Sequence, residues 1–222
     1  MSTTVSKAPE IIGIGAGGHA RVLIDLIRLT GKWNIRGLLD QNPALKGTSL
    51  DDVPILGDDS LAETLCQAGI RQAFLGVGCI GDCRVRQEIL RRLTALGYHF
   101  PVLLHPMAII SERVMIGPAS CAMAGAIINP GATIGTAAII NSGAIIEHDC
   151  RIGDHAHISP GAVLGGSVHV GEGSHVGIGA VVRQGIRIGK HALIGAGAVV
   201  VKDVADGSKV MGVPAKERPR IP

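Results

Sequence analysis

An apolar residue occupies every sixth position in the second half of this 222-residue chain, without a break from Ile110 to Val200. Counting from 110 to 200 in steps of six gives sixteen hexapeptides in one register. Four positions after most of these residues comes a small or β-branched residue, and glycine often follows the apolar residue directly. A period of six residues is typical of a parallel β-helix, in which each hexapeptide supplies one short strand and one corner.

Three hexapeptides close a triangular coil, so residues eighteen positions apart stack in a column. Aliphatic side chains then point into a narrow prism, whose second inward position must be small, and glycine serves corners that need φ > 0 or close backbone approach. Aromatic side chains would not fit, and all four in the chain precede the repeat. With strands about 4.8 Å apart, a little over five coils make a prism roughly 25 Å long. Hexapeptides of this kind usually wind left-handed, against the general crossover rule.

The first hundred residues alternate between strand and helix patterns. We expect strands at 11–14 and 72–77, a strand between them that ends at Asp40, and helices at 20–29, 61–68 and 84–96. This order predicts a small, mostly parallel, Rossmann-like sheet flanked by helices. The predicted domains are therefore a nucleotide-binding unit at 1–106 and a β-helix with a C-terminal cap at 107–222.

The segment from Gly13 to Gly18 matches GxGxxG between a strand and a helix, and Asp40 follows at the end of the next strand. That combination is the dinucleotide fingerprint, in which helix-terminal amides bind phosphate and the acid binds ribose. The region holds only about half of a dinucleotide-binding fold, because the repeat starts at Ile110. A mononucleotide or a nucleotide-linked sugar fits better. The alternative is that these glycines only permit a tight turn.

Composition excludes several other classes of protein. The net charge is +3 with scattered positive residues, which argues against nucleic acid as a partner. No apolar stretch of eighteen residues occurs and the N-terminus lacks a signal-peptide core, so we expect a cytoplasmic protein without membrane insertion. Five cysteines without metal-site spacing favour reduced thiols and no metal, and Cys150 falls at a small inward position.

Three segments carry a resemblance to a known family: IGAGGHARVLIDLI with LLDQNP, NSGAIIEHDCRIGDHAHISPGA within the repeat, and the closing GVPAK. From about Glu10 to Lys216 the chain resembles the bacterial sugar O- and N-acyltransferases, such as the bacillosamine and perosamine N-acetyltransferases. A sialic acid O-acetyltransferase branch is also similar. The resemblance implies a left-handed β-helix enzyme that transfers acetyl from acetyl-coenzyme A to an amino group, at C4, of a nucleotide-linked sugar. Transfer to a hydroxyl group is the alternative.

The resemblance assigns the catalytic base to His148, with Asp149 beside it raising its basicity. A histidine suits the removal of a proton from a sugar amine that attacks a thioester. Asp149 stands where some relatives have glutamate, so its reach to His148 is left open. Column arithmetic independently places Gly166, eighteen residues on, directly above His148, where its N–H could donate to the oxyanion of the tetrahedral intermediate. A glycine needed only for the corner is the alternative.

The resemblance also places His157 at the acetyl-coenzyme A site and Ile178 and Ala196 where relatives contact the coenzyme through backbone groups. Ile178 and Ala196 are themselves eighteen residues apart, as expected for an extended pantetheine lying along the prism. His157 stacks below His175, so a structural histidine pair is the alternative for that residue. Lys216 and Arg218 either meet the 3′-phosphate of the coenzyme or lie in solvent.

For the nucleotide-linked sugar, the resemblance assigns Gly17, Gly18 and His19 to the diphosphate and sugar. It assigns Asp40 and Gln41 to the nucleoside and Gly78 to a contact at a strand end. Relatives often carry a second acidic residue directly after the one that matches Asp40, whereas this chain has Gln41 there. The resemblance therefore leaves open whether the nucleoside is uridine or guanosine.

Two other classes of function compete with the acetyltransferase on this fold. A metal-dependent carbonic anhydrase needs three converging histidines, for which the repeat offers His148, His155, His157, His169 and His175. That class needs no nucleotide unit, and the motif context differs. A structural or ligand-sensing β-helix would not need the glycine-rich loop or the EHD segment. We expect a homotrimer, because a triangular prism has three flat faces and family sites lie where two prisms meet.

Overall fold

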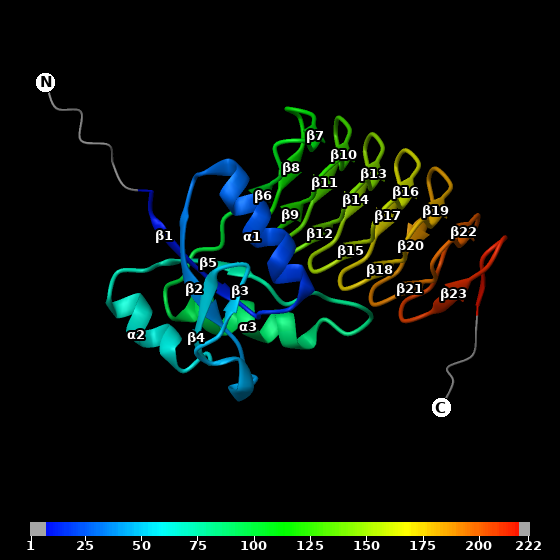
Figure 1. Ribbon diagram of the computed structural model, residues 1–222. Coiled ribbons are helices and arrows are strands. Elements are labelled where there is room, and N and C mark those ends of the chain that lie inside the picture. The colour runs from blue at the N-terminus through cyan, green and yellow to red at the C-terminus, as the bar shows by residue number, and fades with distance from the viewer. Residues whose placement is uncertain (1–7, 218–222) are drawn as a thin grey trace, which may run out of the picture. The chain divides into compact units, whose positions relative to one another are not determined.

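The computed structural model describes residues 8–217, and the chain divides into two compact units (Figure 1). The first unit holds the described residues up to Gly78 together with Glu88–Pro101. The second unit holds Cys79–Gln87 together with the chain from Val102 onward. The sequence predicted a single boundary after residue 106. The segment 79–87 instead groups with the repeats, because its polar atoms bond to them, as described below.

The first unit is a five-stranded sheet of order β3-β4-β2-β1-β5, in which only β3 is antiparallel to its neighbour. Its strands are β1 (Glu10–Ile14), β2 (Asn34–Leu39), β3 (Ser49–Leu50), β4 (Val53–Gly57) and β5 (Gln72–Leu75). Its helical segments are α1 (Gly18–Thr30), η1 (Pro43–Leu45), α2 (Leu61–Gln67) and α3 (Arg84–Ala95), of which α3 begins in the second unit. The predicted Rossmann-like sheet is confirmed, whereas β3 and β4 were not foreseen.

Strand β1 lies in the interior of this sheet, because it pairs with β2 on one side and with the edge strand β5 on the other. Its isoleucines are buried, and the Cβ of any larger residue at Gly13 would collide with the ring of Phe74. Helix α1 is amphipathic, burying Leu23, Ile24 and Ile27 among others, and ends at Gly31 in the left-handed conformation. Within residues 8–217, no helix is both long enough and apolar enough to cross a membrane.

The second unit is the left-handed parallel β-helix that the hexapeptide period predicted. Each hexapeptide supplies a two-residue strand, and strands eighteen residues apart pair in parallel, as Ile127 pairs with Ile145. The second residue of each strand in the repeat points inward and the first points outward. Inward aliphatic residues and the alanines four positions later form one continuous core, in which Cys150 is fully buried. At Gly171 the next coil passes so closely that a Cβ would lie 2.5 Å from the main chain of Gly189.

The prism has three faces, which differ in what their outward residues are (Figure 1). The aliphatic face consists of β7 (Ile109–Ile110), β10 (Ile127–Ile128), β13 (Ile145–Ile146), β16 (Val163–Leu164), β19 (Val181–Val182) and β22 (Val199–Val200). The polar face consists of β8 (Met115–Ile116), β11 (Thr133–Ile134), β14 (Arg151–Ile152), β17 (His169–Val170) and β20 (Arg187–Ile188). The covered face consists of β6 (Leu103–Leu104), β9 (Cys121–Ala122), β12 (Ile139–Ile140), β15 (His157–Ile158), β18 (His175–Val176), β21 (Leu193–Ile194), β23 (Lys209–Met211) and β24 (Lys216–Glu217).

The segment 79–87 lies on the third face of the prism, which we therefore call the covered face. The guanidinium of Arg86 is fully buried and donates to the main-chain carbonyl of Ala137, and the Nδ1–H of His157 donates to that of Cys79. The outward residues of β9, β12, β15 and β18 are buried as a result, unlike most of those on the other two faces. The sequence pattern treats all three faces alike, so it could not show which of them the preceding segment covers.

Candidate active site

The glycine-rich loop joins the end of β1 to the start of α1, and its glycines serve two different purposes. Gly15 has a φ of 95° and a Cβ there would lie 2.6 Å from the side chain of Val77, so the fold itself requires this glycine. Gly17 and Gly18 have ordinary backbone conformations and open space where a side chain would be. Packing and turn geometry therefore do not explain these two residues. Exposed main-chain amides at the N-terminus of α1 suit an anionic ligand.

The other residues predicted for the nucleotide-linked sugar lie at the carboxyl edge of the same sheet. Both carboxylate oxygens of Asp40 accept main-chain N–H groups, from Ala16 at 2.7 Å and from Asn42 at 2.9 Å. Asp40 therefore fixes the glycine-rich loop, a role the sequence did not show. Gly78, after β5, lies beside His19, since a Cβ at Gly78 would be 3.6 Å from that of His19.

Gln41 is exposed directly after Asp40. The structure brings Gly17, Gly18, His19 and Gly78 to one edge of the sheet with Asp40 and Gln41, because β1, β2 and β5 are parallel and adjacent. Their assignment to particular parts of a ligand stays a prediction.

His148 and Asp149 occupy the corner between the aliphatic face and the polar face. Asp149 has a φ of 60°, a conformation that aspartate tolerates better than most residues. This turn brings its Oδ2 within 2.8 Å of Nδ1 of His148, so the shorter acidic side chain does reach the imidazole. A carboxylate only accepts hydrogen bonds, so Nδ1 carries the proton and Nε2 keeps its lone pair. The side chain of His148 is 62 % exposed, which leaves Nε2 available to a substrate.

Gly166 lies one coil above His148, as the column arithmetic predicted. A Cβ at Gly166 would lie 2.5 Å from Nε2 of His148 and 2.6 Å from Cε1. The imidazole therefore occupies space that only glycine leaves open. Within residues 8–217, the N–H of Gly166 donates to no acceptor, although Ser167 next to it donates to the carbonyl of His148. An unpaired donor beside Nε2 is the arrangement that an oxyanion requires.

His157 lies on the covered face, where both of its ring nitrogens are engaged. Its Nδ1–H donates to the carbonyl of Cys79 at 2.7 Å, which leaves Nε2 to accept from the side-chain amide of Asn141 at 3.1 Å. Burial, chiefly, lowers the pKa of His157 to about 4, with His175 and Arg86 adding to the effect and the Cys79 carbonyl opposing it. His157 is therefore neutral near pH 7 and is not a second general base.

The alternative reading of His157, as half of a histidine pair, also has a geometric basis. The rings of His157 and His175 meet edge to face with their centroids 4.8 Å apart. Burial also lowers the pKa of His175, so both rings are held neutral. The coenzyme contact that the resemblance implies for His157 stays a prediction.

Ile178 and Ala196 follow β18 and β21 at the corner between the covered face and the aliphatic face. They lie on consecutive coils, and the carbonyl of Ile178 accepts the N–H of Gly197. The side chain of Ile178 is 60 % exposed, which leaves it accessible to a ligand or another chain. Lys216 is exposed in β24, while Arg218 lies outside the described residues.

Sequence reasoning missed Asn141 and the segment 79–87. Asn141 follows β12 in the same column as Ser159, and only the fold shows that its amide meets His157. The expectation of reduced thiols throughout was wrong in one place, because Cys79 and Cys83 form a disulfide. The loop between them brings their Cα atoms to 5.1 Å, a distance that suits a disulfide. A separation of four positions in the sequence does not by itself show this proximity. Cys66, Cys121 and Cys150 are free and buried.

Two family models match the chain. The PglD N-terminal domain matches residues 10–93, and the bacterial transferase hexapeptide model matches residues 131–166 and 167–202. The search of the curated proteins found no match. Within residues 8–217, no group of three histidine, cysteine or acidic side chains is arranged to hold a metal ion.

Several solved structures are similar over nearly the whole chain. Perosamine N-acetyltransferase from Caulobacter crescentus, solved as a histidine variant with CoA and GDP-perosamine, is 38 % identical, with a TM-score of 0.89 and coverage of 95 % of this chain and 97 % of that chain. The acetyltransferase domain of PglB from Neisseria gonorrhoeae, in complex with acetyl coenzyme A, is 35 % identical, with a TM-score of 0.87 and coverage of 95 % and 100 %.

WeeI from Acinetobacter baumannii is 25 % identical, with a TM-score of 0.73 and coverage of 94 % and 100 %. The matches to the first two proteins cover 95 % of this chain and so extend over both units. The chain belongs to the bacterial family of left-handed β-helix sugar N-acetyltransferases.

Proposed function

We propose that this protein transfers an acetyl group from acetyl-coenzyme A to an amino group, at C4, of a sugar linked to a nucleoside diphosphate. The observation that carries the proposal is the hydrogen bond from Nδ1 of His148 to Asp149, which leaves Nε2 of the neutral imidazole as a proton acceptor close to Gly166, whose N–H donates to no acceptor within residues 8–217. The chain is similar to one enzyme solved with CoA and GDP-perosamine and to another solved with acetyl coenzyme A, and this similarity supports the choice of both substrates. The open glycine-rich loop of the first unit supports a phosphate-bearing acceptor.

In the proposed reaction the sugar amine attacks the thioester carbonyl, and Nε2 of His148 takes the proton that the amine loses. The carbon–nitrogen bond forms, and the negative charge that develops on the carbonyl oxygen is met by the N–H of Gly166. The tetrahedral intermediate then expels the thiolate as the carbon–sulfur bond breaks. The imidazolium returns its proton to the thiolate, which regenerates the base and releases coenzyme A. Asp149 holds the Nδ1–H tautomer throughout.

We further propose that two chains of a homotrimer build each site. His148 lies at the corner where the aliphatic face meets the polar face, whereas Ile178 and Ala196 lie at its opposite edge. One chain therefore cannot bring its own His148 and its own coenzyme residues to the same acetyl carbon. His148 of one chain can meet the coenzyme residues of a neighbouring chain. The outward residues of the aliphatic face supply an apolar surface for that contact; they are Ile109, Ile127, Ile145, Val163, Val181 and Val199.

A cytoplasmic location is part of the same proposal. The three free thiols favour a reducing compartment, whereas the Cys79–Cys83 disulfide is of a kind that is rare there.

The proposal is tested with purified protein, acetyl-coenzyme A and a panel of UDP-, GDP- and dTDP-linked amino sugars. Release of free thiol and the mass of the product are followed together. We expect at least one 4-amino sugar to gain one acetyl group at nitrogen, with the matched 4-hydroxy sugar unreacted. Acetylation of the hydroxy sugar alone would identify an O-acetyltransferase instead, and no transfer to any member of the panel would refute the proposed substrate class.

A further inference from the structure

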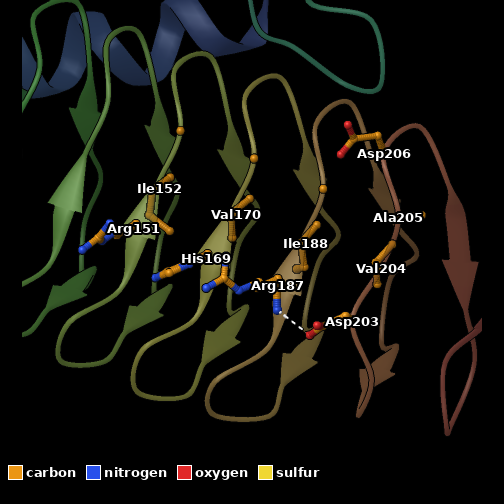
Figure 2. A pocket seen from close by; sticks show the side chains of 13 residues that line it. Arg151, Ile152, His169, Val170, Arg187, Ile188, Asp203, Val204, Ala205 and Asp206 are labelled. Carbon is orange, nitrogen blue, oxygen red and sulfur yellow. Dashed lines mark hydrogen bonds between the residues drawn. The ribbon is translucent and has the colours of Figure 1, made fainter.

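The polar face carries a column of three nitrogen-rich side chains that the proposed reaction does not use. Arg151, His169 and Arg187 are the first residues of β14, β17 and β20, which pair in parallel with these residues directly opposite one another. All three side chains therefore project outward from the same face, as Figure 2 shows. Neighbouring strands lie about 4.8 Å apart, so the two arginine backbones are roughly 10 Å apart with the histidine between them.

The arginines of this column share their groove with two carboxylates, those of Asp203 and Asp206. In the part of the chain that the structure describes, neither arginine forms an ion pair. The nearby carboxylate of Asp203 instead accepts the main-chain N–H of Arg187 at 2.8 Å, and that of Asp206 accepts the main-chain N–H of Lys190 at 2.8 Å.

The two arginines lie on either side of His169 rather than directly opposite each other. Their positive charge is felt by His169, whose pKa is lowered by partial burial first and then by Arg187 and Arg151.

The column borders a shallow groove of about 700 Å³ that runs across three coils of the polar face (Figure 2). The groove is also lined by Gly153, Gly171 and Gly189, and its volume is open beside the arginine side chains. The groove therefore offers room for a ligand group next to the arginines. It is also close in sequence to the proposed base, because Arg151 follows His148 by three residues on the same coil.

We propose that Arg151, His169 and Arg187 bind the phosphate groups of a co-substrate in this groove. Guanidinium groups pair with phosphate through two parallel hydrogen bonds, and arginine is favoured over lysine where that fork is used. Two arginines separated by one strand suit a ligand with more than one phosphate group. Two sources have this chemistry: the adenosine 3′,5′-bisphosphate end of coenzyme A and the diphosphate of the sugar nucleotide. Only the identity of the ligand rests on the proposed function; the phosphate site itself does not.

Equilibrium binding to the full-length protein tests the site without requiring turnover. The probes are adenosine 3′,5′-bisphosphate, coenzyme A, dephospho-coenzyme A, GDP and UDP. The variant Arg151→Gln/Arg187→Gln is compared with Arg71→Gln/Arg113→Gln, which removes the same charge at exposed positions elsewhere. We expect the first variant to weaken binding of coenzyme A and the bisphosphate about 10-fold, a difference that shrinks at high salt, while the control stays within twofold.

The different probes distinguish coenzyme A from the sugar nucleotide as the source of the phosphate groups. They also distinguish failure of the phosphate site from failure of the proposed function. Weakened GDP or UDP binding with unchanged coenzyme A binding would keep the site and assign it to the sugar nucleotide. Unchanged binding of every probe would overturn the site, as would a loss confined to the separate variant Lys216→Gln. A protein that binds phosphate at these arginines but transfers no acetyl group would refute the proposed function and leave the site standing.

Discussion

His148 is the residue on which the proposed chemistry depends most directly. We expect His148→Asn to lower kcat by about 100-fold or more, which is the usual cost of losing a general base. The melting temperature should stay close to that of the wild type, because the side chain is 62 % exposed and lies outside the aliphatic columns. Steady-state kinetics and thermal unfolding check both halves of the prediction. Near-normal turnover, with chemistry shown to be rate-limiting, would exclude His148 as the base.

Gly166 offers a second test, because its missing side chain is what leaves room for the imidazole. In Gly166→Ala the new Cβ would lie 2.5 Å from Nε2 of His148, so the ring must move. We expect a loss of kcat on the order of 10-fold to 100-fold. In the His148→Ala background the same change should cost almost nothing further, which a double-mutant cycle measures. Equal, additive losses in both backgrounds would mean that Gly166 acts independently of His148.

The position of Gly166 could be predicted from the sequence, whereas the contact of Asp149 with His148 could not. The first depends only on the period of eighteen residues, which the hexapeptides impose on every column. The second depends on the positive φ of Asp149 and on Gly131 one coil below, where a Cβ would lie 2.5 Å from Oδ1 of Asp149. The positive φ itself recurs every six residues from Ala119 to Gly197 and so belongs to the repeat, but the repeat does not determine where the side chain of Asp149 points.

At the scale of elements, the covered face links pH to stability through His157. The pKa of His157 falls from its ordinary 6.5 to about 4 in the folded chain, so the unfolded chain binds a proton that the folded chain does not. Its stabilising contribution is present above pH 6.5 and is lost as the pH falls toward 4. This contribution is up to about 3 kcal/mol. Burial lowers the pKa of His155 and His175 as well, so they act in the same direction.

Urea unfolding between pH 7.5 and 4.5 checks this prediction. The wild type should lose stability across the interval, and His157→Gln should lose distinctly less, whatever its stability at pH 7.5. The control His169→Gln changes a less buried histidine on the polar face whose pKa is lowered as well, so it should reduce the slope less than His157→Gln does. Parallel slopes for all three proteins would show that His157 is protonated with an ordinary pKa in the folded state.

The carboxyl edge of the first sheet makes a separate prediction, because Asp40 both fixes the glycine-rich loop and is expected to contact the nucleoside. Asp40→Ala leaves the N–H groups of Ala16 and Asn42 without their acceptors. We expect the KM for the sugar nucleotide to rise about 10-fold, with little change in the KM for acetyl-coenzyme A. Initial-rate measurements with each substrate varied in turn test this division of labour. Equal damage to both values would contradict it.

Elements of the two units differed in how well the sequence predicted them. Every strand from β7 to β22 follows from the hexapeptides, since one residue type recurs at one spacing. In the first unit, α1 and the strands around it follow from apolar runs and glycine turns, but the short β3 and β4 lack a periodic signal. The segment 79–87 has no apolar pattern at all. Its place on the covered face depends on Arg86 and on the carbonyl of Cys79, neither of which carries a local signature.

The whole molecule presents an outward aliphatic column that a single chain leaves exposed, with Ile109 at 66 % and Val181 at 42 %. If this face joins the chains of a trimer, Val163→Arg/Val181→Arg should produce monomers that retain the fold but have lost activity. The loss would occur even though every monomer keeps its own His148, Gly166 and Ile178. Sedimentation together with activity at the same protein concentration checks this expectation. Fully active monomers would show that one chain suffices.

Complementation between two inactive variants tests whether each site uses two chains. His148→Ala removes the proposed base, and Ile178→Arg blocks the opposite edge of the aliphatic face, where the coenzyme is expected. A site composed of two chains takes its base from one and its coenzyme edge from the other. In trimers co-expressed at equal amounts, about a quarter of the interfaces then combine two intact halves, so about a quarter of wild-type activity should return. A site contained within one chain would stay inactive in every mixed trimer, because each chain carries one defect.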